Sequence, residues 1–415
     1  MQLSSSRRAF LLAGLGWAFL LAGGARSDAA DSDASPIVRI SPEAARLHRR
    51  ALLIDGHNDL PWKMRVNGSL SFEEIDISKP APALHTDIPR LRLGGVGAQF
   101  WAAYVPATTL RTGGAARQTL EQIDLIHRMV LRYSETFGFA RSAADIERIR
   151  GSGKIGCLIG IEGGHSIENS LALLRMYYDL GVRYMTLTHS DSLAWADAAT
   201  DQPRSNGLSE FGREVVREMN RLGMLVDISH VSAATMHAAL DVSQAPVIAS
   251  HSAAYAVAPH PRNVPDDVLV RMKRNGGVVM VNFYSGFIVP ESAKAMADVF
   301  EVSRRMREKH PADKDYEKAM TAWREANPIP SGTVKDLVNH IDHIVKVAGI
   351  DHAGLGSDYD GVTQLPVDLP DVSSYPVITQ ELLNRGYSEG DILKVLGGNV
   401  LRALLGAEKA ARKQP

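Results

Sequence analysis

The segment LLIDGHND (residues 52–59) is an apolar run that ends in two acidic side chains and a histidine. Seven further apolar runs follow, and most of them also end in Gly, His, Asp, Glu or Ser. They are residues 96–105, 155–165, 183–190, 224–230, 245–252, 277–284 and 353–361. Continuous apolar runs are typical of strands that are buried on both faces of a parallel sheet. We therefore predict eight parallel strands with polar residues at their ends.

The segments between these runs have helical patterns. Apolar residues recur at helical spacing in residues 119–137, 208–223 and 333–349. Residues 264–277 begin with acidic residues and end with Lys and Arg, as the dipole of a helix prefers. Eight strands that alternate with helices predict an α/β fold, the closed (β/α)₈ or TIM barrel. The alternative is an open doubly wound sheet, which the lack of a Gly-x-Gly-x-x-Gly motif after the first run disfavours.

One long segment interrupts the alternation. Residues 286–330 are charged and mostly helical in pattern, and they separate the seventh apolar run from its return helix. Long connections at the carboxyl end of a strand are usually functional. We interpret this segment as a lid or rim insertion at the barrel mouth, or as an oligomer contact, within one barrel domain over residues 36–415.

The composition excludes some classes of partner. The chain of 415 residues has 46 Lys and Arg and 47 Asp and Glu, so its net charge is close to zero. It has no basic block or nucleic-acid-binding motif, so we expect no nucleic-acid partner. Cys157 is the single cysteine and cannot form a disulfide within the chain.

Residues 1–30 have the pattern of a signal peptide. A basic pair, Arg7 and Arg8, precedes an apolar stretch and small residues. The run around the pair resembles a twin-arginine signal, with a plain secretory signal or an uncleaved anchor as the alternatives. We expect a bacterial protein that is periplasmic or secreted and has no stable membrane anchor after cleavage.

Metal-binding residue types collect at the ends of six predicted strands. They are His57, Asp59, Glu162, His189, His230, His251 and Asp358. In a barrel these ends converge on one rim, where the chemistry of such folds takes place. Nitrogen and oxygen donors without a thiolate suit Zn²⁺, with Mn²⁺ or Co²⁺ as alternatives. The set is too large for one tetrahedral zinc and suits two metals that share a carboxylate.

Seven other histidines follow a different pattern. His48, His127, His237, His340 and His343 fall within predicted helices, and His85 and His310 fall in polar stretches. His340 and His343 lie three residues apart on a helix behind the barrel wall. We interpret this pair as solvated side chains.

Several motifs resemble the signature stretches of the membrane (renal-type) dipeptidases, a branch of the metal-dependent amidohydrolase-like barrels. They are DGHNDLPW, GIEGGHSI, RYMTLTHS, DISHVS, APVIASHS, RNVPDDVL and GSDYDG. The resemblance runs from about residue 45 to about residue 405. It implies a homodimeric zinc peptidase that hydrolyses the peptide bond of free dipeptides with a metal-bound hydroxide. It leaves open whether a D-residue is accepted at the C-terminal position.

The resemblance also implies a role for each motif residue. His57 and Asp59 would bind the first zinc, Glu162 would bridge, and His230 and His251 would bind the second. Asp358 would lie beside the first metal and handle protons, and His189 would contact the substrate near the scissile carbonyl. Arg262 would hold the terminal carboxylate of the substrate, and Trp62 would line the pocket.

The sequence departs from the family pattern in three respects. One cysteine and an N-terminal signal stand where the animal enzymes have disulfides and a GPI anchor. No lysine ends a predicted strand beside the ligands, so a carbamylated lysine bridge is not expected and Glu162 takes that role. Residues 286–330 fall where the side chains of the substrate would be selected.

Two other functions compete with this one. The same metals on the same barrel could hydrolyse a β-lactam, a lactone or a phosphoester, because the fold does not determine the substrate. The chain could also be a metal-binding or solute-binding protein without activity. Asp358 and His189 favour an enzyme, and Arg262 favours a substrate with a free carboxylate, which it can bind with two parallel hydrogen bonds.

Overall fold

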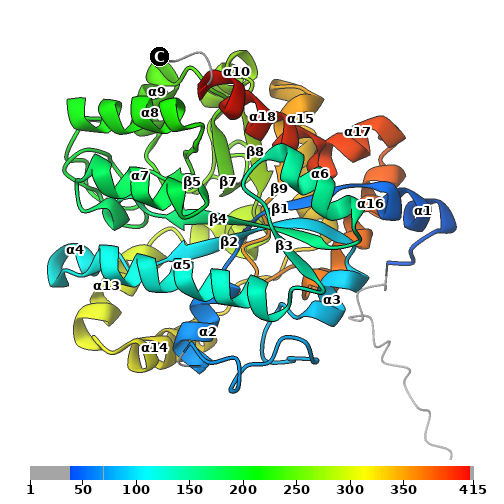
Figure 1. Ribbon diagram of the computed structural model, residues 1–415, viewed down its shortest axis with the longest axis horizontal. Helices are drawn as coiled ribbons and strands as arrows, with labels where there is room; N and C mark the ends of the chain where they lie inside the picture. The colour runs from blue at the N-terminus through cyan, green and yellow to red at the C-terminus, as the bar shows by residue number, and fades with distance from the viewer. Residues whose placement is uncertain (1–37, 69, 412–415) are drawn as a thin grey trace, which may run out of the picture. The chain divides into compact units, whose positions relative to one another are not determined.

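Eight parallel strands close into a barrel in the computed structural model of the protein, which describes residues 38–68 and 70–411 (Figure 1). The hydrogen-bonded order is β1-β2-β4-β5-β6-β7-β8-β9, and β9 pairs with β1 to close the ring. The strands are β1 Leu53–Asn58, β2 Val96–Tyr104, β4 Ile155–Glu162, β5 Val182–Thr186, β6 Leu225–Asp227, β7 Ile248–Ser252, β8 Val278–Val281 and β9 Ala353–Leu355. Each lies within one of the predicted runs, apart from the first residue of β5. The predicted TIM barrel is therefore confirmed.

A ninth strand, β3 (Phe137–Phe139), was not predicted. It pairs in parallel with the first residues of β4, whereas β5 pairs with the last residues of β4. The expected helix over 119–137 is shorter at its end, because α5 (Ala115–Arg132) ends before Tyr133. Tyr133 and Phe137 continue the helical spacing of α5, but their rings pack against each other in the core, where Phe137 also packs against Trp101. The prediction of helix over 133–137 was wrong for this reason.

Helices surround the barrel, and the predicted ones are found. Residues 208–223, 264–277 and 333–349 contain α8 (Glu210–Leu222), α10 (Asp266–Asn275) and α15 (Val334–Val347). The others outside 286–330 are α1 Pro42–Arg50, α2 Leu60–Gly68, α3 Ile88–Leu93, α4 Thr109–Thr112, α6 Ala143–Gly151, α7 Leu171–Asp179, α9 Ala233–Val242, α16 Tyr375–Asn384, α17 Glu389–Leu393 and α18 Asn399–Ala411. The sequence of α8 explains its bounds. Ser209 accepts a hydrogen bond from the backbone N–H of Gly212, and Gly223 ends the helix in the left-handed region with φ of 85°.

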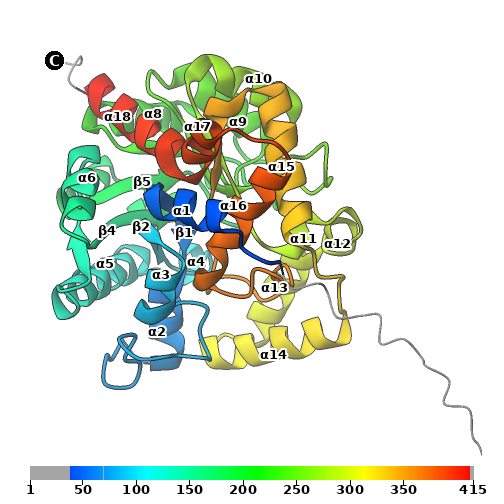
Figure 2. The same cartoon turned by 90° about the vertical axis from the view of Figure 1, so that its right-hand side faces the viewer.

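The long connection after β8 contains four helices. They are α11 Ser285–Ile288, α12 Pro290–Ala295, α13 Val299–Lys309 and α14 Asp313–Ala326. Both views show α13 and α14 at the same end of the barrel as α2, which follows the carboxyl end of β1 (Figures 1 and 2). A small apolar cluster, which includes Tyr284, Phe287 and Met296, joins this segment to the barrel.

Glycines bring the strands close together inside the barrel. A Cβ on Gly160 would lie 2.0 Å from the ring of Tyr184, and one on Gly356 would lie 1.9 Å from the backbone oxygen of Ser250. A barrel of eight strands has an interior just wide enough for its own side chains. The glycines make room for Tyr184 and Met280, which point into this interior.

His340 is a buried structural residue and not a solvated one. Its side chain in α15 is 0% exposed. Its Nδ1 accepts the backbone N–H of Ala254 at 3.0 Å, so its Nε2–H donates to the carbonyl oxygen of Ile288 at 3.0 Å. His343 is partly exposed and pairs with Asp266 at 2.7 Å. The interpretation of this pair was therefore wrong for His340, because the loop after β7 and α11 cover it.

Among the described residues, no helix combines the length and the apolar character that a membrane crossing requires. The predicted signal peptide at residues 1–30 lies outside the described residues.

We predict that Gly356→Ala lowers the free energy of unfolding by roughly 1–3 kcal/mol, because the added methyl group cannot avoid the backbone of β7. The change would be measured from the midpoint of urea unfolding. Gly151→Ala is the control, since nothing lies within 4 Å of its Cβ position at the end of α6. Equal midpoints for Gly356→Ala and the wild-type protein would contradict the prediction.

Candidate active site

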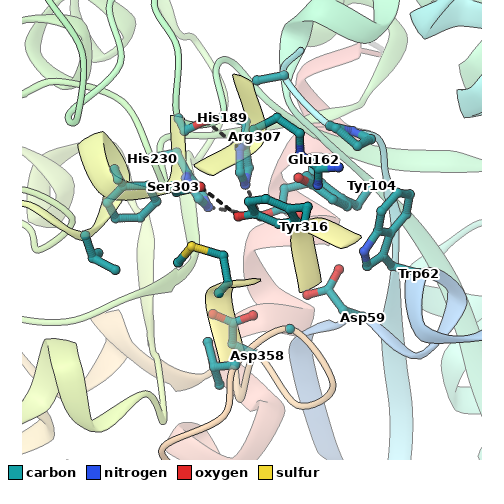
Figure 3. Close-up of a pocket in the computed structure, with 18 of the residues that line it drawn as sticks. Asp59, Trp62, Tyr104, Glu162, His189, His230, Ser303, Arg307, Tyr316 and Asp358 are labelled. Carbon is teal, nitrogen blue, oxygen red and sulfur yellow. Dashed lines mark hydrogen bonds and ion pairs between the residues drawn. The ribbon is translucent and has the colours of Figure 1, made fainter. Parts of the chain in front are cut away.

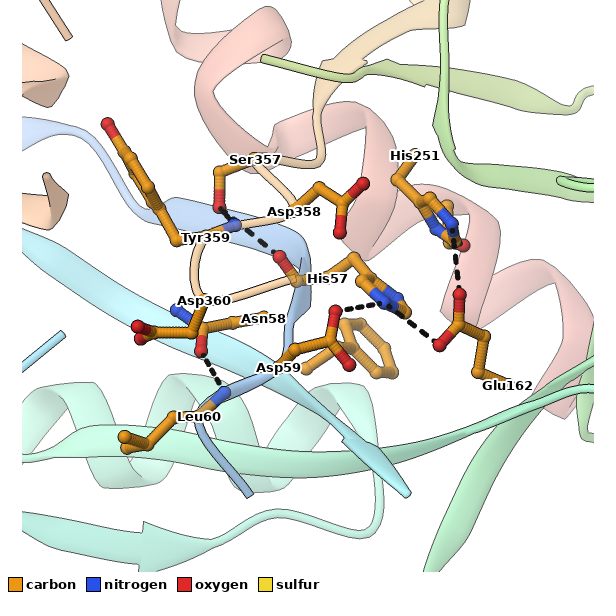
Figure 4. Close-up of polar contacts among 12 residues, drawn as sticks. His57, Asn58, Asp59, Leu60, Glu162, His251, Ser357, Asp358, Tyr359 and Asp360 are labelled. Atoms are coloured by element: carbon orange, nitrogen blue, oxygen red, sulfur yellow. Dashed lines mark hydrogen bonds and ion pairs between the residues drawn. The ribbon is translucent and has the colours of Figure 1, made fainter. Parts of the chain in front are cut away.

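The six predicted metal ligands and His189, which was predicted to contact the substrate, lie together at the carboxyl end of the barrel (Figures 3 and 4). His57 lies within β1, Glu162 is the last residue of β4, and His251 lies within β7. The other four follow directly after β1, β5, β6 and β9: Asp59, His189, His230 and Asp358. The rim therefore gathers side chains from six strands that are distant in sequence.

These residues form three overlapping groups, and within each group the candidate ligand atoms all lie within 4.8 Å of one another. The groups are His57, Asp59 and Asp358; His57, Glu162 and His251; and Glu162, His189 and His230. Glu162 belongs to two groups. Its Oε2 lies 3.7 Å from His57 Nε2, whereas its Oε1 lies 3.0 Å from His230 Nε2 and 3.4 Å from His251 Nε2. The two oxygens of this carboxylate thus face different histidines.

The backbone around two of these residues is strained. His230 has φ of 66° and Asp358 has φ of 63°, in the left-handed region that residues other than glycine seldom adopt. Such strain is retained where the surrounding structure enforces it, and it is common at functional sites. The loop with Asp358 is held by backbone bonds from Asp358 N–H to the His57 oxygen at 3.1 Å and from Asp59 N–H to the Tyr359 oxygen at 2.8 Å.

Hydrogen bonds behind the site fix the orientation of His57. The hydroxyl of Tyr184 donates to the carbonyl oxygen of Gly56 at 3.1 Å, so it accepts from His57 Nδ1–H at 2.8 Å. The proton of this imidazole is then on Nδ1. Its Nε2 points at Asp59 and Glu162 and is the atom that a metal ion would bind in place of a proton (Figure 4).

A matching chain of bonds orients His251. The hydroxyl of Ser250 donates to Asp227 Oδ2 at 2.6 Å, so it accepts from His251 Nδ1–H at 2.8 Å. The lone pair on His251 Nε2 therefore also points into the cluster. Such partners behind a metal ligand set its tautomer and its ring orientation.

The charges in the cluster shift the pKa values of its members. Burial lowers the pKa of His57, but Asp59, Glu162 and Asp358 raise it to about 10. Burial raises the pKa of Asp358 to about 7 and that of Glu162 well above its ordinary value. Burial also holds His189, His230 and His251 neutral, with each pKa well below its ordinary value. The acidic groups therefore favour a positive charge at His57, whereas burial keeps the other three imidazoles neutral.

This donor set fits divalent cations. His230 Nε2 lies 2.8 Å from His251 Nε2, whose lone pair faces it, and both lie near Glu162 Oε1. Asp59 Oδ1 is buried without a hydrogen-bond partner among the described residues. Buried lone pairs and carboxylates that converge without enough donors call for a positive charge between them. Imidazole and carboxylate ligands suit zinc and similar first-row ions.

Arg262 lies beside the cluster and has an unusual environment. It is 1% exposed, and none of the described carboxylates lies within 4.0 Å of its guanidinium. Its contacts are long ones, to Ser252 Oγ at 3.4 Å and to the His251 oxygen at 3.2 Å, and its Nε has no partner among the described residues. Burial lowers its pKa to about 10, so it remains charged at neutral pH. An arginine in this position is ready to bind an anion.

A cavity of about 210 Å³ connects these groups (Figure 3). Asp59, Glu162, His189, His230, Arg262 and Asp358 line it, together with the predicted Trp62. Residues of α13 and α14 line the facing side, so the 286–330 segment borders the cavity. The volume is below the roughly 300–1,000 Å³ of a pocket for a drug-sized ligand, which suits a small substrate.

Some residues of the site were not predicted. Asn282 donates to Asp358 Oδ2 at 2.8 Å, and Tyr184 and Asp227 orient the histidines. Asn282 could have been identified from the sequence, since it is a polar residue directly after the apolar residues of the run over 277–284, where the strand ends. Tyr184 could not, because a tyrosine within a strand is usually a core residue.

The sequence matches the family model described as membrane dipeptidase (Peptidase family M19) over residues 41–415. Solved structures with the same fold include the "probable dipeptidase PvdM" from Pseudomonas aeruginosa, with 26% identity and a TM-score of 0.76. That match covers 89% of this chain and 98% of the other. A metallopeptidase from Rhodobacter sphaeroides, liganded with a phosphinate mimic of the dipeptide L-Ala-D-Ala, has 23% identity and a TM-score of 0.69. It covers 86% of this chain and 99% of the other, and at this identity it establishes the fold alone.

We predict that Tyr184→Phe weakens the binding of divalent cations by about 10–100-fold, because His57 Nδ1–H loses its acceptor. Competition with a fluorescent chelator would measure the affinity. Tyr177→Phe is the control, since its buried hydroxyl donates to the Ser166 oxygen at 2.8 Å outside the cluster. An unchanged affinity in Tyr184→Phe, or an equal loss in both variants, would contradict the role of Tyr184.

Proposed function

Because the chain belongs to the membrane dipeptidase family, we propose that the cluster at the barrel mouth is the metal centre at which it hydrolyses free dipeptides. Members of this family are metal-dependent dipeptidases, and this chain is one of them. The observation that carries the proposal is the placement of Glu162 between two sets of histidines, with an unpaired, buried Arg262 beside them.

We propose two zinc ions in each subunit. His57 and Asp59 would hold the first, with Asp358 beside it, and His230 and His251 would hold the second. The two oxygens of Glu162, which face different histidines, support a bridging role for this carboxylate. When bound, such a metal pair polarises a carbonyl group and makes water nucleophilic at neutral pH.

Arg262 would orient the substrate. Its guanidinium can hold the terminal carboxylate of a dipeptide with two parallel hydrogen bonds. A carboxylate one residue beyond the scissile bond would relieve the buried, unpaired charge of Arg262. This requirement for a free C-terminus close to the scissile bond favours dipeptides over longer peptides. Trp62, whose ring packs edge-on against Tyr104 at 4.9 Å between ring centroids, would form the adjoining wall.

His189 would stabilise the oxyanion. Its Nε2 lies 3.6 Å from Glu162 Oε1, on the lining of the cavity. The role requires the proton on Nε2. The hydroxyl of Ser190 lies 3.2 Å from His189 Nδ1 and 3.2 Å from Asp191 Oδ1, and in this tautomer it would donate to Nδ1 instead of Asp191. A fixed donor of this kind contributes several kcal/mol in related oxyanion sites, roughly 3–4 for one donor.

Asp358 would carry the proton. Its Oδ2 accepts from Asn282, which holds the side chain in place at 2.8 Å. Its Oδ1 remains free to take a proton from the attacking water and to deliver it to the leaving amine. A metal-binding protein without activity would need neither this group nor His189.

We also extend three expectations to this chain. The bound L-Ala-D-Ala mimic in the Rhodobacter sphaeroides peptidase supports acceptance of a D-residue at the C-terminal position. The resemblance to the family supports a homodimer. The pattern of residues 1–30 supports export to the periplasm or to the medium, by a twin-arginine route.

The central test is a panel of L-Ala-L-Ala, L-Ala-D-Ala and Gly-D-Ala beside their N-acetylated and C-amidated forms. We expect hydrolysis of the free dipeptides, little hydrolysis of the C-amidated ones, and no activity after removal of metal with a chelator. Release of free amino acids would be followed by chromatography. Faster turnover of amidated or non-peptide substrates, such as β-lactams, would reassign the substrate and the role of Arg262.

We predict that Arg262→Ala raises the KM for L-Ala-L-Ala at least tenfold and leaves the bound metal content unchanged. The reason is the loss of a charge-assisted pair with the substrate carboxylate, while the metal ligands remain. Steady-state kinetics and atomic absorption would measure the two quantities. Arg221→Ala, at an exposed pair with Glu218, is the control. Unchanged KM in Arg262→Ala would remove the carboxylate-binding role.

A further inference from the structure

The wall of the cavity that faces the metal centre carries an excess of positive charge. It is formed by one side of α13 and one side of α14, where residues three or four positions apart lie together. The lining residues from these helices are Val299, Phe300, Ser303, Arg304 and Arg307 on α13, and Tyr316, Glu317, Met320 and Arg324 on α14. They include three arginines and one carboxylate. The lining faces are therefore mixed, with apolar Val299, Phe300 and Met320 beside the arginines.

Arg307 is the most rigidly held of these arginines. It is 9% exposed, and its guanidinium stacks on the ring of Tyr316 at 3.5 Å from the centroid. Its Nη1 donates to Asp313 Oδ1 at 2.7 Å, and the hydroxyl of Tyr316 is bonded to Ser303 Oγ at 2.7 Å (Figure 3). Among the described residues this is the only hydrogen bond of a guanidinium that has five N–H donors, and Arg307 lines the cavity.

The arginines of this wall do not neutralise the metal centre. None of them lies within 4.0 Å of Asp59, Glu162 or Asp358. Arg304 lies 3.8 Å from Asp191, which Arg111 shares at 3.6 Å, so its charge is partly offset. Arg324 is half-buried and has no carboxylate within 4.0 Å among the described residues. Arg307 pairs with Asp313 through Nη1 at 2.7 Å, which offsets part of its charge, but its other N–H groups have no partner among the described residues. These groups and the guanidinium of Arg324 are the donors that could bind a further carboxylate.

The wall lies within reach of a bound dipeptide. Arg307 and Arg324 line the same cavity as Tyr104 and Tyr284. The ring of Tyr104 packs on His189 at 4.9 Å between centroids. The two arginines therefore share one cavity with the groups proposed to bind the dipeptide.

We propose that Arg307 and Arg324 form a subsite for an anionic side chain, so that the enzyme prefers dipeptides containing Asp or Glu to their amide isosteres. This subsite rests on the dipeptidase function proposed above and specifies its substrate class. Arg262, which follows β7, binds the terminal carboxylate of the dipeptide. The arginines of the facing wall bind a second carboxylate, on the side chain of the substrate. Half-buried guanidinium groups gain most from a carboxylate, which pairs with them through charge-assisted hydrogen bonds.

The test compares kcat/KM for L-Asp-L-Ala and L-Ala-L-Asp with kcat/KM for L-Asn-L-Ala and L-Ala-L-Asn. We expect at least one acidic dipeptide to exceed its amide isostere tenfold or more in the wild-type enzyme. Arg307→Gln and Arg324→Gln should each reduce this ratio at least fivefold, and Arg307→Lys should retain part of it. The ratio is informative because a disturbed fold would lower kcat/KM for the acidic dipeptide and for its amide isostere to the same extent.

Arg305→Gln is the matched control. Arg305 lies on the same helix, is exposed, does not line the cavity and lies 3.5 Å from Glu301. Its replacement should leave the ratio unchanged. Equal rates for the acid and amide substrates, or an unchanged ratio in both Arg307→Gln and Arg324→Gln, would overturn the subsite while the dipeptidase function stands.

A second readout keeps the subsite testable if turnover is absent. Failure to hydrolyse any dipeptide would overturn the proposed function. Calorimetric titration of L-Asp-L-Ala, L-Ala-L-Asp and their amide isosteres into the metal-loaded protein would then decide the subsite. Tighter binding of an acidic dipeptide that depends on Arg307 would support the subsite, and equal binding of the acid and amide forms would overturn it.

Discussion

The structure depends on a cluster of buried carboxylates and imidazoles at one end of a parallel barrel. Glu162, Asp59 and Asp358 lie beside imidazoles of the same cluster, and water has little access to these groups. Carboxylates in such a place repel one another and lose hydration, so they either take up protons, as the raised pKa values of Glu162 and Asp358 indicate, or need a strong positive charge between them. The supporting strands, the strained loops and the hydrogen bonds behind the site all keep these groups from moving apart.

Two further buried carboxylates hold the rim in place. Asp55 accepts hydrogen bonds from the N–H and hydroxyl of Ser357 and from the hydroxyl of Tyr375, and so it ties β1 to the loop after β9. Asp227 does the same for β6 and β7 through the N–H and hydroxyl of Ser250. Each lies two or three residues before a histidine of the cluster. Backbone position and ligand orientation are therefore set by the same bonds.

The sequence was sufficient for the barrel and for the gathering of the candidate ligands. Buried parallel strands produce apolar runs that are easy to recognise in a sequence. Because these strands all run in the same direction, their carboxyl ends lie at one rim of the barrel. Contacts that depend on the third dimension were not readable. The burial of His340 and the orientation of His57 by Tyr184 come from neighbours that are distant in the chain. The strand at Phe137 was missed because its aromatic residues continue the helical spacing of the segment before it.

The catalytic groups and the facing wall belong to different parts of the chain. The ligands lie on or directly after barrel strands, whereas α13 and α14 belong to one continuous excursion between β8 and α15, outside the hydrogen-bonded ring. None of the proposed metal ligands lies in this excursion, so its residues can change without replacing a ligand. Proteins that descend from one ancestral gene can therefore change their substrate preference through substitutions in about forty consecutive residues. Sequence differences among such proteins would be expected to concentrate in this segment.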